Sequence, residues 1–512
     1  MGYHFLTGVT GLLGRYIVKD LLLADVPVAV LVRPTRKASA RQRVENVMAY
    51  WEAQLGRSLP RPVVLEGDIT EPDLGLDPRA TRWVAENCDT MLHNAASLTF
   101  QSTGRESEPW RSNVEGTRNV LELCRNAGIR RFNHVSTAYV CGLRDGRILE
   151  TELDVGQQLS NDYEQSKIDA ENLVRSADFL DSLTVFRPAI IVGDSQTSYT
   201  TTYHGFYAPL QVICTMSQQM EIDATTRIYT SARFAALSGH ETKNLVPVDW
   251  VSAVMSHVVT HPEHHGKTYH LTPRHPVTAR LLADVLEQAA GFYAVSFGEC
   301  GVPHSELTEY EQLFYEMISV YSSYWRDDPT FDTTNTRTAA PHLPCPHVDR
   351  AMLLRMAHYA MSINFGGPRT KPPELEFDSH VVLDPLSEAL DRLPSNAVPS
   401  RVGLQITGPG GGQWSLLLQD GELVGADLGI VSQCKATFSL DVETFASVTR
   451  GECTADEALS TGRLQLAGNG LPRPRLLKML TNLAETSRSC SAAAAGESAH
   501  DHQRERTAAP VR

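Results

Sequence analysis

The sequence predicts an α/β protein with a doubly wound parallel-sheet domain and its substrate subdomain, followed by a small C-terminal α+β domain. Three observations predict this fold class. Apolar runs of strand length alternate with helical patterns up to about residue 195, a glycine-rich turn follows the first run, and the composition changes after residue 375. Alternating strands and helices indicate βαβ units, which bind ligands beyond the carboxyl ends of their strands.

The first domain is expected to cover residues 1–375, with its core over about 1–195. The predicted strands are "YHFLTG", "VPVAVLVR", "RPVVLEGD", "DTMLHNAA", "RRFNHVST" and "SLTVFRP". The predicted helices between them cover residues 11–24, 38–55, 112–127 and 160–176.

Residues 196–375 are expected to form the substrate-binding or lid region. "NLVPVDWVSAVMSHVV" predicts a turn and then a helix, and "KTYHLTP" predicts a strand that returns to the sheet. The aromatic-rich stretch "EYEQLFYEMISVYSSYW" has helical spacing, and such stripes are more often packing surfaces than ligand sites.

A proline- and glycine-containing linker is expected over residues 376–383, and a small α+β domain over residues 384–486. Its predicted elements are a helix at "LDPLSEALDRL", strands at "VGLQITG", "GQWSLLLQDGELVG" and "KATFSLDV", and helices through 442–459 and 472–486. The tail at 487–512 is small, polar and aperiodic, so we expect it to be disordered.

The composition is that of an ordinary globular chain, with 42% hydrophobic and 21% charged residues in 512. A formal net charge of −14 argues against general affinity for nucleic acid. No apolar run is long enough to predict a membrane span, and the N-terminus does not resemble a signal peptide. The nine cysteines include no C-x-x-C pair, which favours a reducing, cytoplasmic location.

The glycine-rich turn "LTGVTGLLGRYIV" points to a dinucleotide. It follows a predicted strand and opens a predicted helix, so that its amides can approach a pyrophosphate at the positive helix end. The predicted cofactor contacts of this turn are Thr7, Gly8, Thr10, Gly11, Leu12, Leu13 and Gly14. A glycine turn that binds nothing is the simpler alternative.

Basic residues follow the second predicted strand. Arg33 stands at the strand end, where an acidic residue would bind a free ribose hydroxyl, and Arg36 and Lys37 are close behind. Arginine suits a 2′-phosphate, so NADPH is preferred over NADH. A surface basic cluster is the alternative interpretation.

Further contacts are expected at the ends of later strands. Asp68 and Ile69 in "GDIT" could accept from the adenine amino group and cover its ring, and the small residues of "HNAA" let a cofactor pass close to the backbone. We therefore add Asn94, Ala95 and Ala96 to the predicted cofactor contacts.

Tyr163 and Lys167 in "YEQSK" are four residues apart in a predicted helix, so they share one face. The order of glycine turn, Asp68, "HNAA", "NVEGT", "VSTAYV", "YEQSK" and "RPAIIVGDS" resembles the extended short-chain dehydrogenase/reductase (SDR) family over roughly 190 residues. That resemblance implies a Rossmann fold and an NAD(P)-dependent oxidoreductase.

The resemblance also implies roles for individual residues. Tyr163 would be the proton donor or acceptor at the substrate carbonyl, Lys167 would stabilise phenolate and hold the nicotinamide ribose, and Thr137 would hydrogen-bond the carbonyl oxygen. Ser136 is the rival for the last role. Asn113 would support a proton relay, with helix capping as the alternative, and Pro188 would line the cofactor site.

Within this branch, "LVRPTRKASARQRVENVMAYW", "GDITEPDLGL", "LHNAASLTF" and "HVSTAYVCG" resemble the thioester-reductase and fatty-acyl reductase group. The implied substrate is an acyl thioester of coenzyme A or an acyl carrier protein, or a similar lipid-like carbonyl, reduced to an aldehyde or alcohol. The stretch "YHGFYAPLQVI" departs from the group's usual substrate loop.

The C-terminal region resembles the sterol-carrier-protein family over about 100 residues. The matching features are Trp414 after a glycine run, "DG" at 420–421 and G-R-L-x-L-x-G from Gly462 to Gly468. This resemblance implies a tunnel for a lipid or acyl chain; a closed module that serves only in dimerisation is the alternative.

Two other functions remain open: an NAD(P)-dependent alcohol or ketone dehydrogenase acting on a steroid-like or polyketide-like substrate, and a non-enzymatic lipid carrier that senses the cofactor. The histidines of "HPEHH" at 261–265 and "PHLPCPH" at 341–347 lack the spacing of a metal site, so no metal is expected. The sequence predicts no particular oligomeric state.

Overall fold

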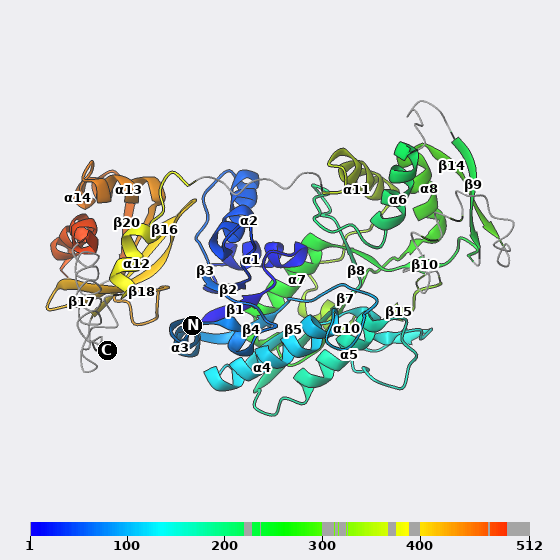
Figure 1. Cartoon of the computed structure of the whole chain (residues 1–512), viewed down its shortest axis with the longest axis horizontal. Helices are drawn as coiled ribbons and strands as arrows, with labels where there is room; N and C mark the ends of the chain where they lie inside the picture. Colours follow the sequence, from blue (N-terminus) through cyan, green and yellow to red (C-terminus); the bar gives the residue numbers. More distant parts are fainter. Residues whose placement is uncertain are drawn as a thin grey trace, which may run out of the picture.

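A computed structural model describes residues 2–219, 228–235, 237–298, 326–366, 375–388, 400–468 and 472–488, together with Gln312, Glu316 and Tyr324 (Figure 1). Its two main β-sheets have seven and five strands. The smaller sheet lies beside the N-terminal part of the chain, and the elements of the predicted substrate region lie at the opposite end.

The seven-stranded sheet is parallel throughout and confirms the predicted doubly wound α/β fold. In spatial order its strands are β3 (Val63–Glu66), β2 (Val28–Val32), β1 (Tyr3–Thr7), β4 (Cys88–His93), β5 (Arg131–Val135), β7 (Ser182–Pro188) and β12 (Thr268–Leu271). The strand order reverses between β1 and β4, and such a switch point opens a crevice at the carboxyl edge of a sheet.

Each face of this sheet has its own apolar core. On one face, α1 (Leu12–Leu23), α2 (Ala40–Leu55) and α7 (Val248–Thr260) share a single buried cluster. On the other face, α3 (Pro78–Asn87) and α4 (Gly116–Ala127) share a second one, to which α5 (Asp162–Arg175) contributes. Coverage of both faces explains why β2 is apolar at every position and fully buried.

The structure differs from the sequence prediction at two places in this domain. The helix predicted over 112–127 begins as a π-helical turn, η2 (Arg111–Glu115), before α4. The start of "NLVPVDW" is not a turn but a short strand, β11 (Leu245–Pro247), which pairs with β8 (Ile190–Val192). That pairing joins segments far apart in the chain, which local periodicity does not reveal.

Three of the described helices in the substrate region surround a third apolar cluster: α6 (Tyr207–Gln219), α8 (Ala279–Ala290) and α11 (Arg350–Ser362). The strands β9 (Ile228–Ala235) and β14 (Phe292–Gly298) pair beside α8. The aromatic helix predicted over 309–325 lies outside the described residues, apart from Gln312, Glu316 and Tyr324.

The C-terminal sheet has a separate apolar core, with Trp414 completely buried in it. Its strands in spatial order are β18 (Glu422–Leu428), β17 (Gly412–Gln419), β16 (Ser400–Thr407), β19 (Ala436–Asp441) and β20 (Leu464–Gly468). Its helices are α12 (His380–Glu388), α13 (Val442–Arg450), α14 (Ala455–Ser460) and a helix over 473–488.

Three boundaries of this region differ from the prediction. The helix α12 begins at His380, inside the segment expected to be a linker over 376–383. The G-R-L-x-L-x-G motif forms the edge strand β20, which pairs with β19. The last helix runs to residue 488, into the predicted tail, whose remaining residues lie outside the described part.

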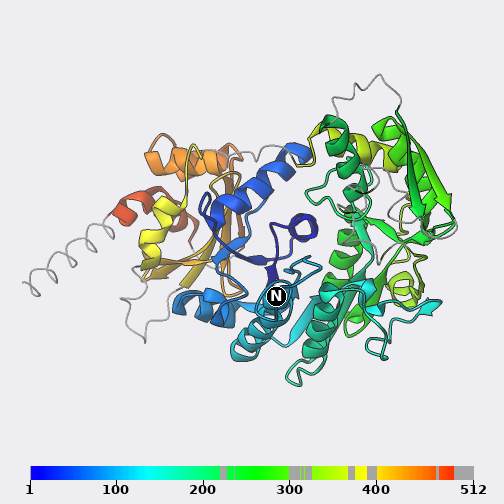
Figure 2. The ribbon, with the colours of Figure 1, turned by 45° about the vertical axis from the view of Figure 1, so that its right-hand side comes forward.

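The two sheets are joined by polar contacts around Tyr3. Its hydroxyl donates to Gln413 Oε1 at 2.8 Å and accepts from the Ile430 amide at 2.6 Å. The Trp83 indole donates to the Leu428 carbonyl at 2.6 Å. Gly429, at a φ of +77°, lies directly against both aromatic rings, so the end of β18 fits closely against Tyr3 of β1 and Trp83 of α3. Figure 2 shows the C-terminal sheet beside the N-terminal elements.

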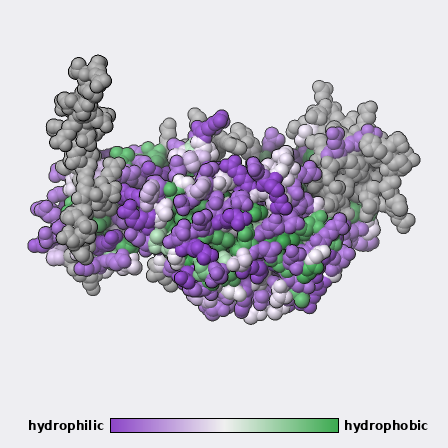
Figure 3. Space-filling model, turned by 60° about the horizontal axis from the view of Figure 1, so that its bottom comes forward, coloured by the Kyte–Doolittle hydropathy of each residue, from purple (hydrophilic) through white to green (hydrophobic). Residues whose placement is uncertain are grey.

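Among the described helices, none combines the length and the apolar content needed to cross a bilayer. On the face drawn in Figure 3, hydrophobic residues lie in patches among predominantly hydrophilic ones.

We predict that Gly429→Ala loosens the contact between the two sheets. The new Cβ would lie 2.8 Å from Trp83 Cζ2 and 2.9 Å from Tyr3 Oη, too close for either aromatic group. Hydrogen exchange of peptides covering β1 and α3 should accelerate, while the core around Trp414 keeps its protection.

Gly462→Ala is the matched control, because Gly462 has a φ of +74° and a Cβ added there would have no atom within 4 Å. It should show only the backbone penalty of about 1 kcal/mol in thermal unfolding. Equal exchange at β1 and α3 in the two variants would contradict the close fit at Gly429.

Candidate active site

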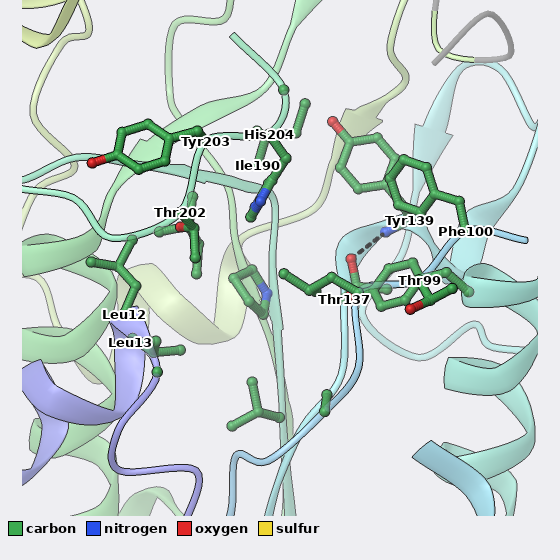
Figure 4. Close-up of a pocket in the computed structure, with 18 of the residues that line it drawn as sticks. Leu12, Leu13, Thr99, Phe100, Thr137, Tyr139, Ile190, Thr202, Tyr203 and His204 are labelled. Carbon is green, nitrogen blue, oxygen red and sulfur yellow. Dashed lines mark hydrogen bonds between the residues drawn. The ribbon is translucent and has the colours of Figure 1, made fainter. Parts of the chain in front are cut away.

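A cavity of about 1190 Å³ opens at the carboxyl edge of the seven-stranded sheet. Its walls come from the ends of β1, β2, β4, β5 and β7, from the loop over 202–206 and from α8 (Figure 4). The predicted site residues that line it are Thr7, Gly8, Thr10, Gly11, Leu12, Leu13, Arg33, Asp68, Ile69, Asn94, Ala95, Ala96, Thr137, Tyr163, Lys167 and Pro188. Gly14, Arg36 and Asn113 do not line it.

The three glycines of the first turn have different structural roles. A Cβ on Gly8, whose φ is +77°, would lie 2.8 Å from the Ala95 amide, and one on Gly14 would lie 2.1 Å from the Gly8 carbonyl oxygen. Those two positions therefore allow close backbone packing. A Cβ on Gly11 would meet only the Gly8 oxygen, at 3.4 Å, and Gly11 lines the cavity.

The start of α1 suits a dinucleotide pyrophosphate. Its N-cap, Gly11, makes no side-chain capping bond, and its first turn contains no acidic residue. The first amides of a helix lack intrahelical acceptors and carry partial positive charge, which favours a bound anion. The residues present thus fit a dinucleotide cofactor.

A buried hydrogen-bond chain holds the glycine turn to β4. Thr7 Oγ1 accepts from the Asn94 and Ala95 amides at 3.1 Å, so its proton goes to His93 Nδ1 at 2.9 Å. His93 Nε2 then donates to Thr117 Oγ1 at 3.1 Å. Burial, with Lys167 nearby, lowers the pKa of His93 to about 3, so the ring is neutral.

Sequence reasoning treated "HNAA" as small residues beside a cofactor and missed this role of His93. The signal available was a histidine at a buried strand end, opposite a hydroxyl residue on the neighbouring strand. Its partner Thr117 lies on α4 and donates in turn to the Asn113 carbonyl at 2.6 Å, a link that only the fold reveals.

The adenosine end of the cavity contains one arginine that the sequence prediction did not include. Arg43, from the first turn of α2, donates to the Arg33 carbonyl and to Thr10 Oγ1, the latter at 2.9 Å. It lines the cavity, whereas Arg36 is exposed on the preceding turn. A basic residue in the helix turn after a basic strand end was the available signal.

Arg33 and Asp68 form an ion pair at this end of the cavity, with Arg33 Nη1 and Asp68 Oδ2 3.1 Å apart. Burial acts to raise the pKa of Asp68, but hydrogen bonds from Thr70 and Arg33 hold it below its ordinary value. The Asp68 carboxylate is therefore ionised at neutral pH, and it lies beside the Arg33 guanidinium.

Tyr163, Lys167 and Thr137 come together in the cavity lining near the end of β5. Asn161 caps α5 by accepting from the Glu164 amide at 3.0 Å, which places Tyr163 in the first turn and Lys167 one turn later. Lys167 Nζ donates to the Val135 carbonyl at 2.6 Å, at the end of β5. Two residues farther on, the Thr137 hydroxyl is close enough to hydrogen-bond the phenol.

The two titratable groups of this cluster are shifted in opposite directions. Burial raises the pKa of Tyr163 to about 12, against the hydrogen bond with Thr137. Burial also lowers the pKa of Lys167 to about 8, against the attraction of Glu171. Near neutral pH the phenol therefore keeps its proton and most Lys167 side chains are charged.

Ser136 and Thr137 both line the cavity but differ in their contacts. The Ser136 amide donates to the Phe186 carbonyl at 2.7 Å, and its buried hydroxyl has no hydrogen-bond partner among the described residues. Thr137 Oγ1 accepts from the Tyr139 amide at 3.3 Å (Figure 4) and faces Tyr163. This geometry favours Thr137 for the carbonyl contact.

Asn113 lies in the π-helical turn and does not cap a helix. Its Oδ1 accepts from the Ser97 amide at 2.7 Å, and its Nδ2 donates to the Ser97 carbonyl at 3.1 Å and to Ser166 Oγ at 2.9 Å. Ser166 donates to the Tyr163 carbonyl at 2.8 Å. Asn113 thus joins the loop after β4 to the first turn of α5.

The helix α5 is anchored to β7 by a completely buried ion pair. Arg187 Nη2 and Glu171 Oε1 are 2.6 Å apart, and both side chains have zero exposure. Burial acts to raise the pKa of Glu171, but Arg187 keeps it below its ordinary value, so the carboxylate stays ionised. This pair fixes the face of α5 that carries Tyr163 and Lys167.

Beyond the phenol, the cavity is largely apolar and aromatic. The ring centroid of Phe100 lies 5.9 Å from that of Tyr163 and 5.6 Å from that of Tyr324. The ring centroids of Tyr139 and Tyr324 are 5.7 Å apart. The farther lining residues are Phe206, Leu237, Leu245, Leu282, Leu286 and Phe297. Sequence reasoning did not identify this end, because its residues come from distant segments.

One histidine of each motif, His261 of "HPEHH" and His342 of "PHLPCPH", packs against His257, and no histidine of either motif lines the cavity. The ring of His257 is 4.1 Å from that of His261 and 4.6 Å from that of His342. Within the described ranges, no group of three or more His, Cys, Asp or Glu side chains is arranged to hold a metal ion.

Comparison with known proteins agrees with the parallel α/β fold. Residues 6–255 match the family model described as male sterility protein, an NAD-binding domain. The chain is 25% identical over 409 residues to the aldehyde reductase lnaA of Aspergillus flavus, covering 73% of this chain and 37% of that protein. Over 147 residues it is 34% identical to CG8306 of Drosophila melanogaster, whose name describes a fatty acyl-CoA reductase; this covers 27% of this chain and 28% of that one.

Among solved structures, the terminal R domain from the myxalamid PKS-NRPS biosynthetic pathway has a TM-score of 0.56 and 26% identity, covering 73% of this chain and 93% of that one. The chain spans well under half of the two curated relatives, while it spans nearly all of the R domain. The matched part of this chain is therefore an NAD(P)-binding reductase domain of the extended SDR type, related to thioester and fatty acyl reductases.

Proposed function

We propose that this protein is an NADPH-dependent reductase of an acyl thioester, or of a similar lipid-like carbonyl, with an appended lipid-binding domain. One observation carries the proposal: Tyr163, Lys167 and Thr137 converge at the point where a dinucleotide-sized groove meets an apolar, aromatic end. The groove suits the cofactor, and the apolar end suits an acyl chain.

In the proposed reaction, the substrate carbonyl lies between Tyr163 and Thr137. Bound NADPH supplies a hydride. The two hydroxyls stabilise the oxygen as it becomes negative, and Tyr163 transfers its proton to that oxygen. Lys167, held by the Val135 carbonyl, stabilises the phenolate that remains.

With a thioester, this step yields a hemithioacetal. Its carbon–sulfur bond then breaks, the oxygen returns its proton to Tyr163, and the thiolate leaves and takes a proton from water, so that an aldehyde remains. Reduction of the aldehyde at the same three residues would yield the alcohol. The similarity to a terminal R domain of a PKS-NRPS pathway supports a carrier-bound thioester over free coenzyme A.

We further propose that residues 384–486 bind the lipid or acyl chain. A five-stranded sheet with helices around an apolar core supports this proposal, as does the attachment of that sheet to the reductase domain through Tyr3 and Trp83. A tethered lipid site raises the local concentration of an apolar substrate without adding a contact to the active site.

Tyr163→Phe tests the reaction directly. With NADPH and an octanoyl thioester, the wild-type protein should release thiol in step with NADPH oxidation. The variant should lose roughly 100-fold or more in kcat, because the proton donor is gone, while it still binds NADPH. The control Tyr359→Phe lies on α11 outside the cavity lining and should keep full activity. Turnover of ketones without thiol release would replace the thioester proposal with a ketone dehydrogenase.

The pH dependence should follow Lys167. Its pKa is lowered to about 8, so the ammonium is present below pH 8 and is lost above it. We expect kcat/KM for thioester reduction to decline above about pH 8, by as much as tenfold per unit. Lys167→Arg should be less active at pH 7 but should not decline between pH 8 and 9.5, because a guanidinium stays charged. A wild-type profile that stays flat to pH 9.5 would contradict this role.

Cofactor choice should depend on Arg43 together with Arg33. Removing either guanidinium, as in Arg43→Ala, should raise KM for NADPH by about 10- to 100-fold, since charge-assisted hydrogen bonds are worth about 1.5–3 kcal/mol. KM for NADH should change little. Arg118→Ala, at an exposed position on α4, is the control. Equal effects on both cofactors would argue against a 2′-phosphate contact.

A further inference from the structure

His204 lies in the cavity wall at the end that would receive the acyl group. It is carried by the loop before α6, and Figure 4 shows it beside Ile190, across the cavity from Thr137 and Tyr139. The next residue, Gly205, has a φ of +57°, and a Cβ there would lie 2.8 Å from Ile190 Cγ2. The loop therefore approaches β8 closely and holds His204 in the wall.

The imidazole of His204 has no hydrogen-bond partner in the described part of the chain, although the backbone carbonyl of the same residue accepts from the Tyr207 amide at 3.3 Å. Burial lowers the pKa of the ring, so it is neutral near pH 7. A neutral imidazole offers one donor and one acceptor. Both are available to a ligand in the cavity.

Three other polar side chains of the lining are already paired within the protein. Lys243 Nζ donates to Asp328 Oδ1 at 2.8 Å, and the Tyr139 hydroxyl donates to Asp328 Oδ2 at 2.7 Å. The Tyr324 hydroxyl donates to Glu164 Oε1 at 2.8 Å. These side chains already use their hydrogen-bond donors within the protein, whereas the His204 imidazole does not.

Apolar residues of the same lining include Ile190, which the loop approaches closely, and Phe206, two residues after His204. A plain alkyl chain there would bury the imidazole without a partner, which is unfavourable. A chain that carries an oxygen at the right depth would both satisfy the ring and fill the apolar wall.

We propose that His204 is a specificity-determining residue that hydrogen-bonds an oxygen substituent, a hydroxyl or keto group, on the acyl part of the substrate. This inference rests on the proposed reduction of an acyl carbonyl. It assigns the substrate class more narrowly, as oxygenated rather than plain saturated acyl chains.

The test compares matched substrates with and without the oxygen. Octanoyl-pantetheine is measured against its 2-, 3- and 5-hydroxy derivatives, with NADPH, for the wild-type protein and three variants. The wild type should favour one hydroxylated isomer by about tenfold in kcat/KM, mostly through KM. His204→Phe should remove that preference and leave the plain substrate unchanged or improved, whereas His204→Gln should keep part of it.

Thr200→Val is the control for disturbance of the loop, because Thr200 lies outside the cavity lining and its hydroxyl donates to the Thr202 carbonyl at 2.9 Å. It should retain the wild-type preference. The affinity for NADPH should be the same in all four proteins. A wild type that does not discriminate, or a His204→Phe variant that discriminates as before, would overturn the inference, and so would a loss confined to NADPH affinity.

A binding measurement separates this inference from the proposed reaction. With NADP⁺ present, calorimetry should show that the wild type binds 2-, 3- or 5-hydroxylated octanols better than 1-octanol, and that His204→Phe does not. If no thioester is turned over but this preference is present, the reaction proposal fails and the role of His204 stands. If thioesters are turned over without any such preference, the reverse holds.

Discussion

The active site depends on the attachment of α5 to the sheet. The buried Glu171–Arg187 pair joins this helix to β7, and the Lys167–Val135 contact joins it to the end of β5. Removing one partner of such a pair leaves an uncompensated buried charge, at a cost of about 3–5 kcal/mol. The helix is therefore held with its catalytic face toward the cavity, and small movements of Tyr163 relative to Thr137 are opposed.

The same attachment determines the electrostatics of the site. Burial at the strand ends raises the pKa of a phenol and lowers the pKa of an amine, because it disfavours the charged form of each. Tyr163 is kept as an acid, while Lys167 titrates within a unit or so of neutrality. The neutral His93 beneath the glycine turn adds no charge of its own and fixes the geometry of Thr7. The floor of the cavity is thus rigid and carries little charge apart from Lys167.

The C-terminal sheet and the acyl end of the cavity are formed at different parts of the reductase domain. The C-terminal sheet packs against β1 and α3 through the hydroxyl of Tyr3 and the indole of Trp83, whereas the acyl end of the cavity is built from β8, the 202–206 loop and α8. A lipid site in the C-terminal part would therefore supply substrate by proximity. Substrate choice would remain with the residues of the cavity wall, among them His204.

Sequence patterns predict the parallel α/β fold, the glycine turn and the Tyr163–Lys167 pair, because each of these depends on local spacing: strand length, three glycines before a helix, and two residues one turn apart. The folded chain alone reveals which hydroxyl faces Tyr163, that Arg43 joins Arg33, and that His204 lacks a partner within the described part of the chain. These facts depend on contacts between segments that are far apart in the chain. The π-helical turn at Asn113 and the strand β11 escaped prediction for the same reason, since their hydrogen bonds are completed by loops and strands that local periodicity does not record.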